Sequence, residues 1–129
     1  DPRYGDVVAE VYQFLQARIA WAESEGIPRA RIAIDPGIGF GKTLEHNLDL
    51  LRNLKRFANL GCTLVVGTSR KAFLGTLTGR DVSERQTATI VSSLAAIERG
   101  AHVVRVHDVG PMVDAIKVWE ALRGGNELS

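Results

Sequence analysis

Charged side chains follow three short apolar runs, at Asp35, at 69–71 (Ser-Arg-Lys) and at 105–108 (Arg-Val-His-Asp). A carboxylate such as Asp35 can accept two parallel hydrogen bonds from a flat N–C–NH2 edge, for example that of an aminopyrimidinone. Arg105 lies in an otherwise interior strand, so its charge needs an anionic partner, and His107 falls on the same face two residues later. Arg105 and His107 therefore predict an anion clamp for phosphate or pyrophosphate.

The segment 35–43 reads Asp-Pro-Gly-Ile-Gly-Phe-Gly-Lys-Thr and looks like a phosphate-binding loop. Neither familiar motif fits, because Pro36 stands where a P-loop has its first glycine and Lys42 stands where a dinucleotide fingerprint has its third. We expect instead that the three glycines let the backbone approach a flat ligand. Phe40 has no helix or strand face to join, so we expect it to be a mobile stacking residue.

The other candidate residues have weaker signals. His46 and His102 have no neighbour comparable to Arg105 beside His107, and they are expected to be structural or exposed. Cys62 starts a strand with no base beside it, so we interpret it as a small hydrophobe. Asp108 either orients a neighbour or caps the final helix. No Cys/His spacing suggests zinc.

Alternating helices and short apolar strands are needed to bring these residues together. Since the carboxyl ends of parallel strands face the site in α/β proteins, three such ends place acid, bases and imidazole on one rim. Asp6 is a plausible N-cap, and Ser83 with Gln86 predicts a capping box. Helices are expected at 6–24, 45–59, 73–78, 84–99 and 111–122, and strands at 32–34, 63–66 and 101–106. The residues expected to face inward are Val7, Val8, Val11, Phe14, Leu15, Ile19, Ala22, Leu48, Leu51, Leu54, Phe57 or Ala58, Ile90, Val91, Leu94 and Ile97.

Composition bounds the class of protein. The chain has 129 residues, 45% of them hydrophobic, which is enough for one domain with a core. A net charge of +1 gives no support for nucleic-acid or membrane binding, and no apolar run is long enough for a span or a leader. A single cysteine fits a reducing compartment, so we expect a cytoplasmic protein. The chain begins Asp1-Pro2 without Met, from which we expect a fragment or a processed piece.

Three motifs together closely resemble dihydropteroate synthase. They are Asp-Pro-Gly-Ile-Gly-Phe-Gly-Lys at 35–42, Gly-Thr-Ser-Arg-Lys-Ala-Phe-Leu-Gly at 67–75 and Arg-Val-His-Asp-Val at 105–109. The opening helix, 4–11, is also similar. The resemblance covers nearly the whole chain, in order and at the right spacing.

The resemblance implies an α/β fold, the C-terminal three βα units of a (β/α)8 TIM barrel with parallel strands. Residues 1–129 would be the C-terminal portion of a pterin-binding barrel domain whose N-terminal strands are absent. The family joins p-aminobenzoate to 6-hydroxymethyl-7,8-dihydropterin pyrophosphate in folate biosynthesis and releases pyrophosphate. It implies Mg2+ bound with the pyrophosphate, its protein ligand coming from the missing N-terminal part and none from this chain. Sulfonamides would compete with p-aminobenzoate.

The resemblance also assigns roles by motif position. Asp35, Gly67 and Lys71 would bind the pterin. Phe40, Lys71 and Ala72 would line the p-aminobenzoate pocket. Arg105 and His107 would bind the pyrophosphate. The family also implies a homodimer through the last helices, and we expect that face at Val113, Ile116, Val118, Trp119 and Leu122.

Two departures from the family pattern matter. Ala72 stands where the family often has Ser or Arg, which puts a contact to the p-aminobenzoate carboxylate in doubt. Three strands are expected where a barrel needs eight, so we expect the chain to be inactive without the N-terminal part. The alternatives are a methyltetrahydrofolate methyltransferase domain that shares the pterin Asp, a P-loop nucleotide binder, and an inactive folded fragment that only binds or assembles.

Overall fold

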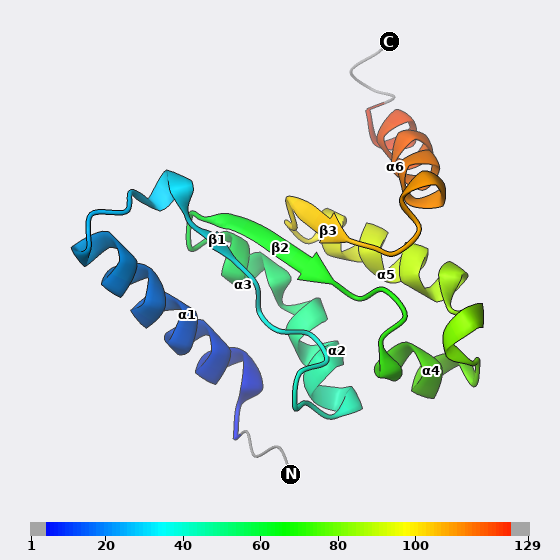
Figure 1. Cartoon of the computed structure of the whole chain (residues 1–129), viewed down its shortest axis with the longest axis horizontal. Coiled ribbons are helices and arrows are strands. Elements are labelled where there is room, and N and C mark those ends of the chain that lie inside the picture. The colour runs from blue at the N-terminus through cyan, green and yellow to red at the C-terminus, as the bar shows by residue number, and fades with distance from the viewer. Residues whose placement is uncertain (1–4, 125–129) are drawn as a thin grey trace.

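A computed structural model describes residues 5–124 of the chain, and Figure 1 shows how its elements are arranged. Helices and strands alternate along it, which confirms the expected α/β class. The elements are α1 (Val7–Ser24), η1 (Arg29–Arg31), β1 (Ala33–Ile34), α2 (Leu44–Arg52), α3 (Leu54–Ala58), β2 (Thr63–Gly67), α4 (Ala72–Thr78), η2 (Val82–Glu84), α5 (Gln86–Glu98), β3 (Val103–Arg105) and α6 (Val109–Arg123). None of the helices between residues 5 and 124 is long and apolar enough to cross a membrane.

The three strands form one parallel sheet in the order β1-β2-β3 (Figure 1). Ala33 pairs with Thr63, and Gly67 pairs with Arg105. Because all strands run the same way, their carboxyl ends meet at one edge of the sheet. The expectation that the polar strand ends share a rim is therefore confirmed.

The two faces of the sheet differ in burial. Side chains alternate between faces, and the even-numbered Ile34, Leu64 and Val66 are almost fully buried. They share one core with Leu15 and Ile19 of α1, Leu50 of α2, Leu54 and Phe57 of α3, and Ala96 of α5. On the other face Ala33 and Thr63 are exposed, and Val103 is 44% exposed. Helices thus cover one face, and the opposite face is open among the described residues.

The helix expected over 45–59 is broken at Asn53 into α2 and α3. The Asn53 side chain donates to the Asp49 carbonyl at 2.8 Å, which is the kind of local contact that competes with a regular helix. The break also rotates the inward face, since Leu50 is fully buried whereas Leu48 and Leu51 are only half-buried. Leu54 and Phe57 are buried as expected.

The capping box expected at Ser83 and Gln86 is wrong. A separate turn, η2, precedes α5, and the first residue of α5 has no side-chain cap. The inward face is also different, because Thr89, Ser93 and Ala96 are buried while Val91 is 61% exposed. Ile90, Leu94 and Ile97 are half-buried. Small polar side chains face inward here because Thr68, at the end of β2, bonds the Ser92 and Ser93 hydroxyls at 2.7 and 3.4 Å.

The first and last helices have the expected positions with different faces. Asp6 caps α1, its carboxylate accepting from the Ala9 N–H at 3.1 Å, but Phe14 is 63% exposed and not in the core. In α6 only Met112 is buried among the described residues. The Tyr4 start of the family-like opening lies outside the described residues.

Candidate active site

Asp35 follows β1 directly and uses both of its carboxylate oxygens. Oδ1 accepts from the Gly37 N–H at 2.8 Å, and Oδ2 accepts from Arg105 Nη2 at 2.5 Å. The first bond holds the turn after Pro36, and the second joins the ends of β1 and β3 across the sheet. The predicted acid and the predicted anion ligand are therefore direct partners in the structure.

The guanidinium of Arg105 lies over Gly67. A Cβ at Gly67 would come within 3.1 Å of Arg105 Nη2, so the missing side chain makes room for a flat group at the end of β2. The Arg105 side chain is 57% exposed and ends on the open face of the sheet. It could therefore turn toward an anion or let a ring take the space above Gly67.

The glycine-rich segment is braced by its own lysine. Lys42 Nζ donates to the Gly37 carbonyl at 2.8 Å and to the Phe40 carbonyl at 3.0 Å. Burial lowers the pKa of Lys42, and the Asp35 carboxylate partly offsets that effect. Lys42, which made the segment resemble a P-loop, thus stabilises the conformation of the loop itself.

Lys71 reaches from the end of β2 to the glycine-rich segment. Its Nζ donates to the Ile38 carbonyl and lies 4.9 Å from the centroid of the Phe40 ring. Burial lowers the pKa of Lys71, Asp35 raises it, and Arg105 and Lys42 lower it further. Phe40 is 69% exposed and lies outside the core, and its role as a mobile stacking residue stays a prediction.

Two cavities meet at Phe40 and Lys71, which line both. One, of about 350 Å³, also contacts Ala72 and Asn47. The other, of about 230 Å³, also contacts Gly67, Arg105 and His107. The predicted p-aminobenzoate residues thus share one cavity and the predicted pyrophosphate residues share the other.

Asp35 lies apart from both of these cavities. It lines a third one, of about 350 Å³, between α1 and the glycine-rich segment. Arg105 connects Asp35 to the second cavity, because it bonds the Asp35 carboxylate and also lines the cavity with Gly67 and His107. The structure therefore brings the three predicted pterin residues to one rim but not into one closed pocket.

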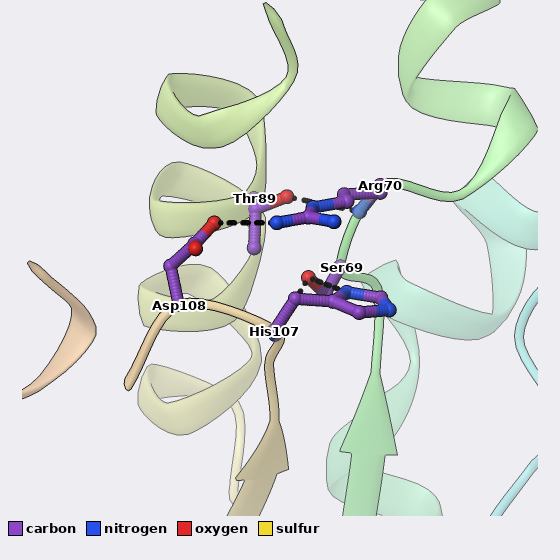
Figure 2. Close-up of polar contacts among 5 residues, drawn as sticks. All are labelled: Ser69, Arg70, Thr89, His107 and Asp108. Carbon is purple, nitrogen blue, oxygen red and sulfur yellow. Dashed lines mark hydrogen bonds and ion pairs between the residues drawn. The ribbon is translucent and has the colours of Figure 1, made fainter. Parts of the chain in front are cut away.

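The loops that follow β2 and β3 are tied together at adjacent residues (Figure 2). Ser69 Oγ lies 2.7 Å from His107 Nδ1, and Arg70 Nη2 donates to Asp108 Oδ2 at 3.0 Å. Asp108 thus orients a neighbouring residue, one of the two roles considered for it. Its side chain makes no capping hydrogen bond to α6.

Sequence reasoning missed Asn47. This residue is 3% exposed, and its Oδ1 accepts from the Gly39 N–H at 2.7 Å, which fixes the middle of the glycine-rich segment. The available signal was its position three residues before Leu50 on the inward face of α2. A polar side chain on a buried helix face has to find a partner.

The residues predicted to be structural have structural contacts. His102 Nδ1 accepts from the Leu64 N–H at 2.9 Å, so its ring extends the ladder between β2 and β3. His46 completes a capping box with Thr43 at the start of α2. Cys62 is buried, and burial raises the pKa of its thiol.

The acidic groups beside the cavities do not form a magnesium site. Asp35 is paired with Arg105 and Asp108 with Arg70, so each carboxylate already has a cationic partner. Across residues 5–124 there is no group of three or more His, Cys, Asp or Glu side chains that could hold a metal ion. The described residues therefore do not fit the expected Mg2+ as its ligands.

Fold and site together define an α/β protein with cavities and paired charges at the carboxyl ends of its parallel strands. The sequence model of the family described as "Pterin binding enzyme" matches residues 1–107. The chain belongs to this pterin-binding enzyme family.

Within this family, the chain is similar to proteins of known activity. The chain is 48% identical over 124 residues to the dihydropteroate synthase of Neisseria meningitidis serogroup C, covering 95% of this chain and 44% of that protein. It superposes on the dihydropteroate synthase of Stenotrophomonas maltophilia with a TM-score of 0.93 and 51% identity, over 95% of this chain and 47% of that one. The Xanthomonas albilineans enzyme, solved in complex with 7,8-dihydropteroate, gives a TM-score of 0.93 and 47% identity, over 95% of this chain and 47% of that one.

These superpositions confirm the expected fold class, three parallel βα units like those of the solved dihydropteroate synthases. The chain spans less than half the length of the relatives it matches.

Proposed function

We propose that the protein is a dihydropteroate synthase of folate biosynthesis. It would condense 6-hydroxymethyl-7,8-dihydropterin pyrophosphate with p-aminobenzoate and release 7,8-dihydropteroate and pyrophosphate. The observation that carries the proposal is the meeting of Asp35, Lys71, Arg105 and His107 at the carboxyl ends of three consecutive parallel strands. The identity to named dihydropteroate synthases supports it.

The chemistry needs positioning and charge neutralisation more than a nucleophilic side chain. The arylamine nitrogen forms a bond to the pterin methylene carbon while the bond from that carbon to the pyrophosphate oxygen breaks. The departing pyrophosphate carries the negative charge, which Arg105 and His107 would stabilise from the smaller cavity. The amine then loses its extra proton.

Asp35 and Lys71 would hold the pterin. The Asp35 carboxylate has about four lone-pair positions, of which the Gly37 N–H and Arg105 occupy two. Two remain for the amino-pyrimidinone edge, and Lys71 Nζ would donate to the ring carbonyl. Gly67 would leave space for the ring, as it now does for the Arg105 guanidinium.

Phe40, Lys71 and Ala72 would form the p-aminobenzoate pocket, where sulfonamides would compete. These three residues line one cavity, and the exposed Phe40 ring is free to cover a flat aromatic ligand. Mg2+ would accompany the pyrophosphate, with protein ligands from outside this chain, because the carboxylates of Asp35 and Asp108 are each paired with an arginine.

Further proposals concern the whole protein. Residues 1–129 would be the C-terminal portion of a pterin-binding barrel and inactive alone, which the open face of the sheet supports.

Val113, Val118 and Leu122 of α6 are 41%, 61% and 79% exposed and would form a homodimer face. A cytoplasmic location is supported by the free, buried thiol of Cys62.

Calorimetric binding of a pterin pyrophosphate analogue to the natural full-length protein tests the proposed function. Asp35→Asn keeps the shape and the acceptor for Gly37 but loses the charge, so we expect at least tenfold weaker binding. Asp114→Asn, on exposed α6, is the matched control and should bind like the wild type. Equal affinity of the Asp35→Asn variant would overturn the assignment of the pterin site.

A further inference from the structure

The hydroxyl of Ser69 contacts His107 twice. Its oxygen lies 2.7 Å from the ring Nδ1 and also accepts the backbone N–H of His107 at 3.2 Å. Ser69 is 9% exposed, so water does not compete freely for these bonds. Figure 2 shows the imidazole held on its Nδ1 side, with Nε2 on the far side of the ring from Ser69.

The hydrogen-bonding capacity of a hydroxyl selects the form of the ring. A serine hydroxyl has one proton to donate and two positions that accept. The His107 backbone N–H takes one accepting position. A second donor at Nδ1 would leave the hydroxyl proton without an acceptor among the described hydrogen bonds, whereas donation to Nδ1 uses that proton. When Nδ1 accepts, the proton of a neutral imidazole must be on Nε2. Nε2–H is then a donor, as an oxyanion ligand requires.

Ser69 is itself held by a strained neighbour. Arg70 has a φ of +56°, a left-handed conformation that is strained for a residue other than glycine. The surroundings enforce it, because the Arg70 N–H donates to Thr89 Oγ1 at 3.1 Å and the Arg70 carbonyl accepts from Arg85 Nη1 at 3.0 Å. Such strain persists only where several contacts determine the backbone.

The strained turn separates two adjacent functional side chains. Ser69, before Arg70, points to His107, whereas Lys71, after it, reaches the Ile38 carbonyl and the Phe40 ring. His107 and Lys71 nevertheless line the same cavity of about 230 Å³, together with Arg105. The imidazole that lines this cavity is therefore held in place by the Ser69 hydroxyl and not by a carboxylate.

We propose that Ser69 is a positioning residue that holds His107 in the Nε2–H form and aims that N–H at an oxygen of the departing diphosphate. The proposal rests on the proposed function, because it names the anion that the function releases. A purely structural role, in which Ser69 only ties two loops together, makes a different prediction. Arg70 and Asp108 form the neighbouring tie and do not contact the imidazole ring, so they provide the matched comparison.

The first test is the ring itself, in the natural full-length wild-type protein. Two-dimensional 15N spectra at about pH 8.5, where a free imidazole is largely neutral, distinguish the two neutral tautomers of His107. We expect the Nε2–H form. The Nδ1–H form would overturn the proposal, and this measurement does not depend on whether any variant folds.

The second test is binding of inorganic pyrophosphate to five variants. Ser69→Ala should mix the tautomers and weaken binding about tenfold, and Ser69→Thr should restore it. Asp108→Asn removes the ion pair of the neighbouring tie and should stay within about twofold of the wild type. In a His107→Ala background, Ser69→Ala should cause no further loss.

Binding of a pterin without phosphates separates the possible failures. Ser69→Ala should leave it unchanged, since the proposed pterin contacts lie at Asp35 and Lys71. If Asp108→Asn weakens pyrophosphate binding as much as Ser69→Ala does, the role is structural and the proposal is wrong. If the wild type binds the pterin but no pyrophosphate, the anion assignment fails. If it binds neither, the proposed function itself fails.

Discussion

Asp35 and Arg105 neutralise each other before any ligand arrives. Their 2.5 Å contact joins the groups that we assign to opposite ends of one substrate, the pterin edge and the pyrophosphate. Both side chains are partly exposed, so water screens the pair and its net contribution to folding is small. A substrate that satisfies both groups can therefore replace the contact at little cost.

Lys71 should make pterin binding sensitive to alkaline pH. Burial lowers its folded-state pKa below the usual 10.5, against the opposing effect of Asp35 and with further lowering by Arg105 and Lys42. Lys71 therefore loses its charge at a lower pH than a free lysine, and affinity for the pterin should fall as the pH rises through that lowered pKa. A pH series of calorimetric titrations measures this.

Lys71→Arg is the informative variant, because a guanidinium keeps its charge throughout that range. Its affinity should be lower at neutral pH, since the side-chain shape differs, but flatter with pH. Lys117→Arg on exposed α6 should reproduce the wild-type curve. A wild-type curve as flat as that of Lys71→Arg would exclude Lys71 from the pterin contact.

Ala72 offers a gain-of-function test. The residue is exposed at the edge of the cavity that we propose for p-aminobenzoate, so a hydroxyl would fit there. Ala72→Ser should tighten p-aminobenzoate binding by about two- to tenfold, the value of one added hydrogen bond. The KM for p-aminobenzoate in the full-length protein measures it, with Ala121→Ser on α6 as control. An unchanged KM would mean that the carboxylate points elsewhere.

At the level of single residues, sequence reasoning identified groups that end strands but not their partners. Asp35, Lys71, Arg105 and His107 were predictable because charge at the end of an apolar strand is unusual. The pairing of Ser69 with His107 could not be predicted, because it depends on a left-handed backbone at Arg70. No glycine at that position indicates such a conformation in the sequence. The ligand roles of all these residues stay predictions.

Among the structural elements, the glycine-rich segment before α2 positions Phe40 and Lys71. Gly39 has a φ of +94°, and a Cβ there would lie 3.0 Å from Lys71 Cδ. Gly39→Ala should therefore displace Lys71 and weaken p-aminobenzoate binding about tenfold, in addition to lowering the free energy of unfolding. Calorimetry and urea denaturation measure the two effects separately.

Gly41→Ala provides the comparison. Gly41 has a φ of +60°, and its Cβ would meet nothing within 4 Å. The substitution should cost about 1 kcal/mol of stability and leave binding nearly unchanged. If both variants bind equally well, contact between Gly39 and Lys71 does not shape the cavity.

Helices and strands with strong periodicity could be predicted from the sequence. The side of each helix that faces the core was harder to predict. The strands were found because short apolar runs between helices indicate buried parallel strands. The break at Asn53 depends on a local side-chain contact to the Asp49 carbonyl, and the polar face of α5 depends on a tertiary partner, the Thr68 hydroxyl. A hydrophobic pattern reveals neither contact.

For the whole molecule, the contrast between the two sheet faces tests the proposal of a larger barrel. Val66 is 1% exposed beneath the helices, so Val66→Asn should cost about 3 kcal/mol or more in any form of the protein. Val103 is 44% exposed on the open face. If further strands cover that face in the natural full-length protein, Val103→Asn should also destabilise it by more than 1 kcal/mol. A change within about 0.5 kcal/mol would indicate that solvent covers the face.

The alternation of faces also limits how the chain can change in length. Asp35, Gly67 and Arg105 fall on the same side as Ala33, Thr63 and Val103, because each strand is counted in steps of two from its first residue. One residue inserted or deleted inside a strand would turn its functional side chain into the helix-covered core. Insertions in the segments that connect the units leave this count unchanged. Natural length variation should therefore collect in the connecting loops and be absent between the start of each strand and its functional end.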